Sequence, residues 1–180
     1  MMPRFSRAVA TLGALMVLIG CNNDTRFANC PGAAILADLA ARPVLKPGAT
    51  VATDPSALLY TVSLVDISTK CSLDIRAGQT QSSVELTFRA TRSPSGRAAS
   101  YSVPYFLAIN QAERVINKRQ FNAQFAFTPG SSSVTFQTAV DGTTLKLENG
   151  RLPTDYQFLA GMDLSDAERA YVTAMGPYKP

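Results

Sequence analysis

The chain has 180 residues, of which 46% are hydrophobic and 17% are charged, a balance typical of a globular protein rather than of a disordered chain or a multi-span membrane protein. It contains no histidine and no tryptophan, and the missing histidine removes the commonest general base and a common metal ligand. The net charge of +4 is too small to indicate nucleic-acid binding, which needs a basic stripe.

The first 20 residues have the layout of a secretory signal peptide. A short basic segment, residues 1–7, precedes an apolar run over residues 8–19. A bilayer span needs about 20 apolar residues, so this run is too short to cross a membrane and suits the core of a signal peptide. Because Arg4 and Arg7 lie in this leader, its removal lowers the net charge to about +2.

The predicted leader ends in Leu18, Ile19, Gly20 and Cys21, followed by a polar run that starts at Asn22. This sequence resembles the lipobox of bacterial lipoproteins, whose cysteine carries a diacylglycerol. The resemblance implies a mature chain that starts at Cys21 and is anchored by lipid in the cell envelope. An aspartate in the next position often causes inner-membrane retention, so Asn22 favours the periplasmic face of the outer membrane. An ordinary signal peptide and an uncleaved N-terminal helix are the alternatives.

Two further cysteines, Cys30 and Cys71, remain once Cys21 is lipidated. In an oxidising compartment such a pair is expected to form a disulfide, which would stabilise the fold by about 4 kcal/mol in the chain-entropy model. Two thiols without histidine make a poor metal site. We therefore predict a structural disulfide, and no metal or other cofactor.

We expect residues 21–32 to form the lipidated N-terminus and a short tether, and residues 33–180 to form a single domain. Residues 33–39 suit either a strand or one helical turn. The prolines of residues 40–55 indicate an extended connection across one edge of a sheet.

From residue 58 onward, apolar and polar side chains alternate. This pattern predicts antiparallel strands over residues 58–67, 71–76, 83–91, 102–109, 115–127, 134–140, 143–147 and 156–162. Residues 110–114 form a connection of hairpin length, and Asp141-Gly142 is a strong hairpin sequence. Near the end, Ser165 and Glu168 have the spacing of a capping box, which predicts a short helix to about Met175.

Many short strands separated by turns predict a mainly β fold, either a sandwich or a barrel. The sequence Leu152-Pro153-Thr154-Asp155-Tyr156 resembles the tyrosine corner of fibronectin type III domains, in which the tyrosine hydroxyl bonds back to the preceding connection. This resemblance favours an antiparallel immunoglobulin/fibronectin-III-like β-sandwich with a short C-terminal helix.

The layout as a whole also resembles small envelope lipoproteins of unknown function that contain one β-sandwich domain. The matching features are the lipobox, an early Cys-Pro, a second cysteine after a long strand, a Val-Pro-Tyr-Phe strand, and a Tyr-containing final strand before a short helix. This resemblance implies no activity.

We find no pattern typical of an active site. The loop serines have no G-x-S-x-G elbow and no histidine to activate them, and no phosphate loop is present. Asp66 and Asp74 would converge if their strands paired, but solvated acids at strand ends explain them better. Asp163, Asp166 and Glu168 lack the spacing of a calcium loop. We predict that the protein is not an enzyme.

Two surfaces are candidates for binding. Val103-Pro104-Tyr105-Phe106 is a possible partner-binding edge, because proline within a strand indicates an edge or a bulge, and Tyr105 and Phe106 cannot both face one core. A covered edge is the plainer interpretation.

The second candidate is a basic patch for anionic lipid or lipopolysaccharide. Its residues would be Arg92, Arg97, Lys118 and Arg119, and a solvated face is the plainer interpretation.

Together these features predict a non-catalytic, lipid-anchored envelope protein that acts as an interaction or assembly module. It would contact the membrane through the lipid on Cys21 and would bind an envelope protein partner, but no nucleic acid. The alternative is a binder of lipid, lipopolysaccharide or glycan at the periplasmic face.

Overall fold

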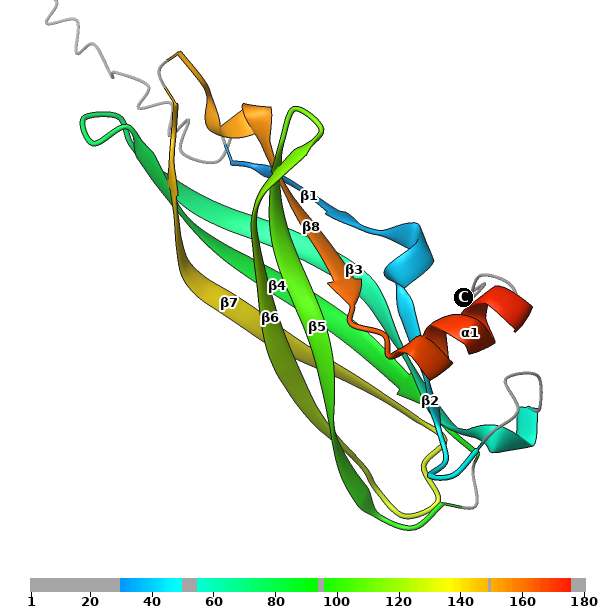
Figure 1. The fold of residues 1–180 in the computed structure, drawn as a ribbon. Helices are drawn as coiled ribbons and strands as arrows, with labels where there is room; N and C mark the ends of the chain where they lie inside the picture. Colours follow the sequence, from blue (N-terminus) through cyan, green and yellow to red (C-terminus); the bar gives the residue numbers. More distant parts are fainter. Residues whose placement is uncertain (1–29, 50–54, 94–95, 149, 176–180) are drawn as a thin grey trace, which may run out of the picture.

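The computed structural model describes residues 30–49, 55–93, 96–148 and 150–175. Two four-stranded β-sheets pack face to face, with one short helix near the C-terminal end (Figure 1). The predicted signal peptide, Cys21 and residues 22–29 lie outside the described residues. With 3-10 helices written η, the elements are β1 (Gly32–Ile35), η2 (Ala37–Leu39), β2 (Ala41–Leu45), η3 (Pro55–Ala57), β3 (Leu58–Asp74), β4 (Gln79–Thr91), β5 (Ala99–Gln111), β6 (Arg114–Phe127), β7 (Ser133–Lys146), η4 (Pro153–Asp155), β8 (Tyr156–Met162) and α1 (Asp166–Met175).

One sheet, which we call sheet A, has the strand order β1-β8-β5-β6, and the other, sheet B, has the order β2-β3-β4-β7. Neighbouring strands are antiparallel, except that β1 runs parallel to β8. The predicted mainly β sandwich with a short C-terminal helix is confirmed. The finer immunoglobulin/fibronectin-III topology is not confirmed.

The core lies between the two sheets and is rich in aromatic side chains. In β4 the alternating residues Val84, Leu86, Phe88 and Ala90 are all fully buried, as the pattern over residues 83–91 predicts. Phe88 stacks on Phe136 of β7, with ring centroids 5.2 Å apart. Each large apolar side chain buried in this way contributes about 1.5–3 kcal/mol to folding.

Strand β3 is one continuous strand where the sequence predicts two. The pairing with β4 shifts between Leu64 and Asp66, so Val65 is an extra residue that bulges out and is 39% exposed. Because side chains alternate, one inserted residue reverses the face to which all later side chains point. Before the bulge an even-numbered residue, Leu64, faces the core. After the bulge an odd-numbered residue, Ile67, packs against the core. The break in the sequence pattern marks this bulge, not the end of a strand.

The predicted hairpin at Asp141-Gly142 is wrong, because β7 runs straight through both residues. Its pairing with β4 shifts so that Asp141 and Gly142 together lie opposite Ser83, which donates a hydrogen bond to the Asp141 carboxylate. Gly142 has a φ of +66°, a conformation that glycine adopts without steric cost. A bulge of this kind needs the same residue as a tight hairpin turn, so the dipeptide alone does not distinguish them.

The predicted edge at Val103–Phe106 is present only in part. Strand β5 lies between β8 and β6, but its pairing with β8 begins at Tyr105, so Tyr105 and Phe106 have a strand on both sides, whereas Val103 and Pro104 pair with β6 alone. Strand β8 ends at Met162, opposite Tyr105, and the carbonyl of Pro104 accepts a hydrogen bond from the N–H of Asp163. Pro104 therefore lies just beyond the last pair of the neighbouring strand, where its missing N–H costs no ladder hydrogen bond.

Tyr105 and Phe106 point to opposite faces of sheet A, as adjacent strand residues must. Tyr105 belongs to the core between the sheets. Phe106 lies on the other face and is 5% exposed. It packs so closely on Gly161 that a β-carbon there would lie 2.8 Å from the ring, and the same β-carbon would lie 3.0 Å from Leu39 of η2. Tyr105 is thus buried between the two sheets, and Phe106 is buried on the other face of sheet A against Gly161.

The tyrosine of the predicted corner makes the expected contact. Tyr156 is 2% exposed, and its hydroxyl accepts the backbone N–H of Glu148 at 3.0 Å. The side-chain amide of Gln111 donates to the same hydroxyl at 3.3 Å. These hydrogen bonds tie the connection before η4 to the end of β5.

Both alternatives considered for residues 33–39 are present in succession, because β1 is followed directly by the turn of η2. Helix α1 is tied to β2 by an ion pair between Arg42 and Glu168, with Nε 2.8 Å from Oε1. The other Glu168 oxygen accepts hydrogen bonds from the N–H and hydroxyl of Ser165, and the Ser165 hydroxyl accepts from the Glu168 N–H. The predicted capping box is confirmed.

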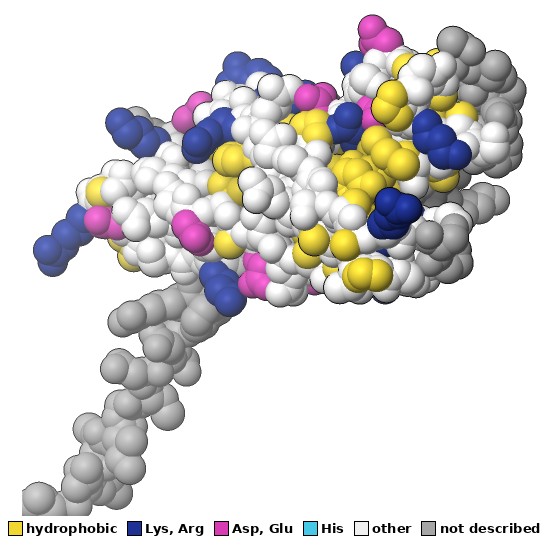
Figure 2. All heavy atoms as spheres, turned by 90° about the horizontal axis from the view of Figure 1, so that it is seen from below, with side chains coloured by type: hydrophobic (Ala, Val, Ile, Leu, Met, Phe, Trp, Pro, Cys, Tyr) yellow, Lys and Arg dark blue, Asp and Glu magenta, His cyan; other side chains and the backbone are white. Residues whose placement is uncertain are grey.

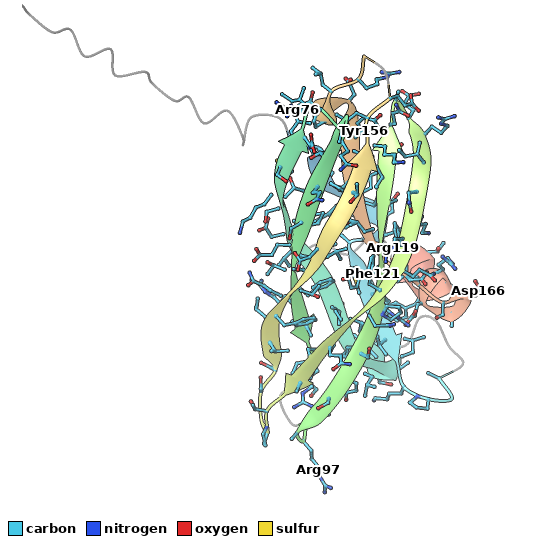
Figure 3. The ribbon with its side chains drawn as sticks, turned by 90° about the vertical axis from the view of Figure 1, so that its left-hand side faces the viewer. Arg76, Arg97, Arg119, Phe121, Tyr156 and Asp166 are labelled. Atoms are coloured by element: carbon cyan, nitrogen blue, oxygen red, sulfur yellow. A yellow bond between two sulfur atoms is a disulfide. The ribbon has the colours of Figure 1, made fainter. Side chains whose placement is uncertain are left out.

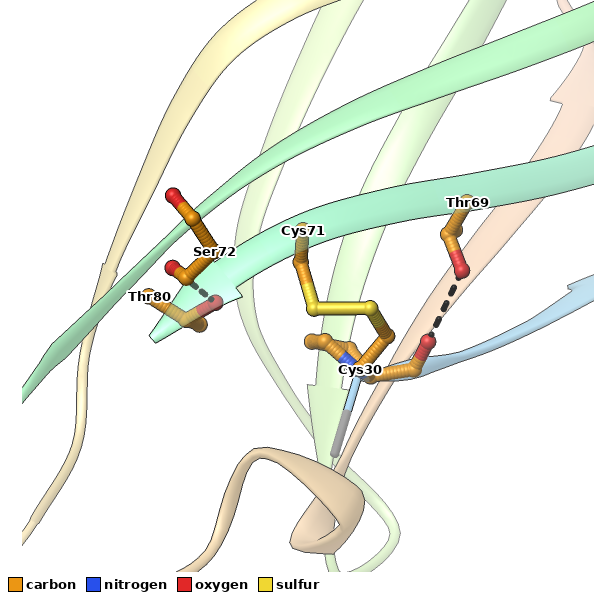
Figure 4. Close-up of a disulfide and its surroundings, with 6 residues drawn as sticks. Cys30, Thr69, Cys71, Ser72 and Thr80 are labelled. Carbon is orange, nitrogen blue, oxygen red and sulfur yellow. Dashed lines mark hydrogen bonds between the residues drawn. A yellow bond between two sulfur atoms is a disulfide. The ribbon is translucent and has the colours of Figure 1, made fainter. Parts of the chain in front are cut away.

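The predicted disulfide is confirmed and links the two sheets. Cys30 lies two residues before the first residue of β1 in sheet A, Cys71 lies in β3 of sheet B, and their α-carbons are 5.6 Å apart (Figure 4). Beside the disulfide, the hydroxyl of Thr69 donates to the carbonyl of Pro31 at 3.2 Å. We call the end of the sandwich that carries this bond the disulfide end.

Replacing both Cys30 and Cys71 with serine should lower the free energy of unfolding by about 4 kcal/mol, because the unfolded chain regains the freedom of a loop spanning 41 residues. Urea unfolding of the oxidised protein and of the double variant measures this difference. Reduction of the wild-type protein should produce the same loss. A double variant as stable as the oxidised protein would contradict the prediction.

The β5–β6 turn carries backbone strain. Ala112 and Glu113 have φ values of +44° and +68°, the pattern of a type I′ turn, which favours Asn-Gly. Replacing the pair with Ala112→Asn and Glu113→Gly should raise stability by about 1 kcal/mol, seen as a higher urea midpoint with an unchanged slope. Glu113→Gln, which removes only the charge, is the matched control and should change nothing. An unchanged or lower midpoint for the double variant would contradict the proposed strain.

Candidate functional site

The four residues of the predicted basic patch do not lie together. Figure 3 shows Arg97 at the tip of the end opposite the disulfide, whereas Arg119 lies about halfway along the sandwich. Lys118 and Arg119 are neighbours in β6 and so point to opposite faces: the Lys118 ammonium lies 4.0 Å from the ring centroid of Phe106, and Arg119 lies over Phe121. The cations are therefore dispersed over the molecule.

Arg92 has a structural role at the end opposite the disulfide. Its guanidinium donates hydrogen bonds to the carbonyls of Gly96, Arg97, Thr128 and Ser131, at 2.6–3.2 Å. It also lies 4.3 Å from the ring centroid of Phe127. Arg92 thus ties the β4–β5 loop to the β6–β7 loop, and it already makes four hydrogen bonds with its five N–H donors.

A shallow pocket of about 450 Å³ lies at this end, partly lined by Lys46, Leu59, Arg97 and Tyr101. Viewed from below, the molecule shows apolar side chains gathered in a patch, with lysine and arginine side chains beside it (Figure 2). The Lys46 ammonium donates to the carbonyl of Ser56 at 2.5 Å, and Arg92 is occupied as described above. Arg97 is the lining cation with no such contact in the described part of the chain, so it is the one basic side chain of this pocket that those contacts leave available.

The two flanks of the sandwich differ. At one flank the chain passes from β1 in sheet A through η2 to β2 in sheet B, and α1 packs beside β2 (Figure 1). At the other flank β6 ends sheet A and β7 ends sheet B, and among the described strands neither has a second neighbour. We call the side bounded by β6 and β7 the open flank.

The free edge of sheet A is therefore β6, one strand away from the predicted edge. Every residue from Arg114 to Gln120 is exposed, and we call residues 114–120 the free stretch. It includes two exposed large apolar side chains, Val115 at 55% and Ile116 at 39%. An edge strand with one side free of a neighbouring strand can accept an additional strand.

Both edge strands bulge at about the same level of the open flank. In β6 the pairing with β5 shifts so that Ile116 has no partner, and in β7 the extra residues are Asp141 and Gly142. Bulges bend a strand and interrupt its ladder, and they are frequent at sheet edges and beside functional sites. Here they lie on the two sides of one cleft.

This cleft has a volume of about 150 Å³. Sheet A contributes Leu107, Ile109, Asn117, Arg119 and Phe121, and β7 contributes Val140, Gly142, Thr143 and Thr144. The side chains of Leu107, Ile109 and Val140 are nearly buried and make an apolar floor, whereas the polar residues lie nearer the surface. The cleft thus combines an apolar interior with hydrogen-bond donors around it.

The lining of the cleft contains no carboxylate, cysteine or histidine that could activate the threonine hydroxyls. Tyr105 stacks behind it on Phe121, with ring centroids 5.5 Å apart. Burial raises the pKa of Tyr105 above its ordinary value of 10.0, and a hydrogen bond to Thr138 opposes this only in part. The phenol therefore stays neutral at neutral pH, and the arrangement supports binding rather than covalent chemistry.

The acidic residues considered in the sequence do not converge. Asp66 and Asp74 lie in the same strand, β3, rather than on paired strands. Asp163 accepts a hydrogen bond from the side-chain amide of Gln120, and Glu168 pairs with Arg42. Within the described residues no group of three or more acidic or cysteine side chains could hold a metal ion.

Comparison of the chain with protein-family models, curated proteins and solved structures gives no match. Among the described residues, no helix has the length and apolar character needed to cross a membrane. Of the cleft residues, the sequence singles out Arg119 as part of a binding surface. Gly142 and Thr143 are missed because the Asp-Gly dipeptide there predicts a hairpin.

Proposed function

We propose that the protein is a lipid-anchored, non-catalytic module of the bacterial cell envelope, and that it binds an envelope protein partner along β6. The supporting observation is the free stretch, residues 114–120, which is exposed throughout and has one neighbouring strand, β5, in the described structure. An extended segment of a partner can pair with such an edge through backbone hydrogen bonds, and Val115 and Ile116 offer apolar contacts to its side chains.

Charge indicates which kind of segment fits. The free stretch contains Arg114, Lys118 and Arg119 and no carboxylate. A second copy of the chain would bring these cations against one another, because antiparallel pairing of two β6 strands places like charges on neighbouring positions. We therefore propose an acidic extended segment of another protein as the partner.

The proposed anchor is compatible with a partner in or near the membrane. The chain between Cys21 and Cys30 spans at most about 30 Å, whereas the 17 residues of β3 extend over about 55 Å. The disulfide end would thus remain near the lipid surface, and the free stretch begins at this end, directly after the β5–β6 turn. Asn22 supports the periplasmic face of the outer membrane as the location.

The alternative function, binding of lipid, lipopolysaccharide or glycan, has uneven support. Lipopolysaccharide would need clustered cations, and the four residues of the predicted patch are dispersed. The cleft at the open flank supports the small-ligand version.

A photocrosslinking amino acid at position 115, in the full lipidated protein in native membranes, should capture one protein partner through an acidic extended segment. Arg114→Glu combined with Lys118→Glu should abolish the crosslink, because the segment is then repelled. Lys70→Glu combined with Arg76→Glu changes the net charge equally on the exposed β3–β4 hairpin and should leave the crosslink intact. Mass spectrometry of the crosslinked peptides identifies the segment.

Crosslinks that reach only lipid and abundant porins, or that persist after the β6 charge reversal, would count against a protein partner at this edge.

Intact mass spectrometry of the protein purified from native membranes tests the anchor. We expect a chain that starts at Cys21, carries a lipid mass increment and gains two hydrogens on reduction. Cys21→Ser should remove the increment and release the protein from acyl-dependent membrane attachment. A mature chain without lipid would exclude the anchor and favour a soluble secreted protein.

A further inference from the structure

We propose that the cleft at the open flank binds an aliphatic carboxylate, with the carboxylate on Arg119 and the alkyl chain on the apolar floor. This inference does not depend on the proposed protein partner. Arg119 belongs both to the free stretch and to the cleft, but the ligand would occupy the space between the sheets, whereas the partner segment would pair with the backbone of β6. Figure 3 shows the basic Arg119 and the aromatic Phe121 close together on the flank of the sandwich.

The position of the two bulges explains why the cleft is accessible. Ile116 has no partner in β5, and Asp141 with Gly142 lies opposite a single residue of β4. At this level neither edge strand continues its regular ladder, so side chains of the inner strand β5 reach the flank. Leu107 and Ile109 of β5 consequently line a surface cleft although both belong to the core.

The charge of Arg119 at the cleft has no oppositely charged partner among the described residues. In the described structure Arg119 makes no ion pair or hydrogen bond, and its contact is with the ring of Phe121, 5.2 Å from the guanidinium carbon to the centroid. A guanidinium has five donors in a planar fork that matches the two oxygens of a carboxylate. Asp141, the acid nearest in sequence to the cleft residues of β7, instead accepts a hydrogen bond from Ser83.

The apolar floor of the cleft favours an alkyl chain as the part of the ligand beyond the carboxylate. Leu107, Ile109 and Val140 are aliphatic and between 5% and 7% exposed, so they offer no hydrogen bonds to the ring hydroxyls of a sugar. A volume of about 150 Å³ accommodates a group of about the size of a benzene ring, and therefore a short stretch of alkyl chain. Asn117, Thr143 and Thr144 add polar side chains around the carboxylate.

The test uses octanoate as the probe and the full lipidated protein in nanodiscs, with empty nanodiscs subtracted. A photoreactive octanoate should label peptides from β5, β6 and β7, and unlabelled octanoate should compete, whereas octanol should compete at least about tenfold more weakly because it lacks the charge. Arg119→Gln should weaken octanoate binding about tenfold or more. Arg114→Gln, on the same strand but outside the cleft, is the matched control and should bind like wild type.

Equal binding by the Arg119→Gln and Arg114→Gln variants would overturn the proposal, as would equal competition by octanol and octanoate, or labelling confined to other parts of the chain. Loss of the position-115 crosslink with octanoate binding intact would concern the protein partner alone, so the two proposals fail separately.

Discussion

The two-residue period of the β-strand determines where the side chains of this sandwich point. Because successive side chains face opposite sides of a sheet, a strand can serve the core only while its register is kept, and one extra residue exchanges the two faces. Three strands contain such residues: Leu59 and Val65 in β3, Ile116 in β6, and Asp141 with Gly142 in β7. The bulge at Val65 changes which residues of β3 face the core, and the bulges of β6 and β7 lie on the two sides of the cleft.

The period also explains which parts of the fold the sequence predicts well. Residues 83–91 alternate without interruption, and the corresponding side chains of β4 are buried as expected. The disulfide, the capping box at Ser165 and the β5–β6 hairpin depend on residues close in sequence or on a single remaining pair of cysteines, so they are predictable too. A sequence pattern is sufficient to predict a structural feature when residues close in sequence determine that feature.

The failures have a common physical origin. Gly142 of the Asp141-Gly142 dipeptide adopts a positive φ, and both a tight hairpin turn and a bulge of this kind require that conformation. Proline at position 104 does mark a place without a second neighbouring strand, but β8 pairs with β5 from Tyr105 onward, so this edge does not extend to Tyr105 and Phe106. Both cases are decided by the length and position of a strand distant in sequence, which no local pattern contains.

The same limit applies to the candidate site. The sequence identifies Arg119 and Arg92 as similar cations, but their surroundings separate them. Arg92 is occupied by loop carbonyls, whereas Arg119 has only an aromatic ring beside it in the described structure. Which cation is available to a ligand depends on which strands end the sheets, because edge position leaves Arg119 at a flank.

The asymmetry between the two flanks connects the proposed anchor to the proposed binding surfaces. Strand β1, which follows Cys30, is at the opposite edge of sheet A from β6, so a chain coming from the proposed anchor would join the domain at the covered flank. The passage through η2 and the ion pair between Arg42 and Glu168 occupy that flank as well. An anchor joined there leaves β6 and β7 unobstructed by the tether's point of attachment. Attachment at the open flank would instead place the chain over the free stretch and the cleft.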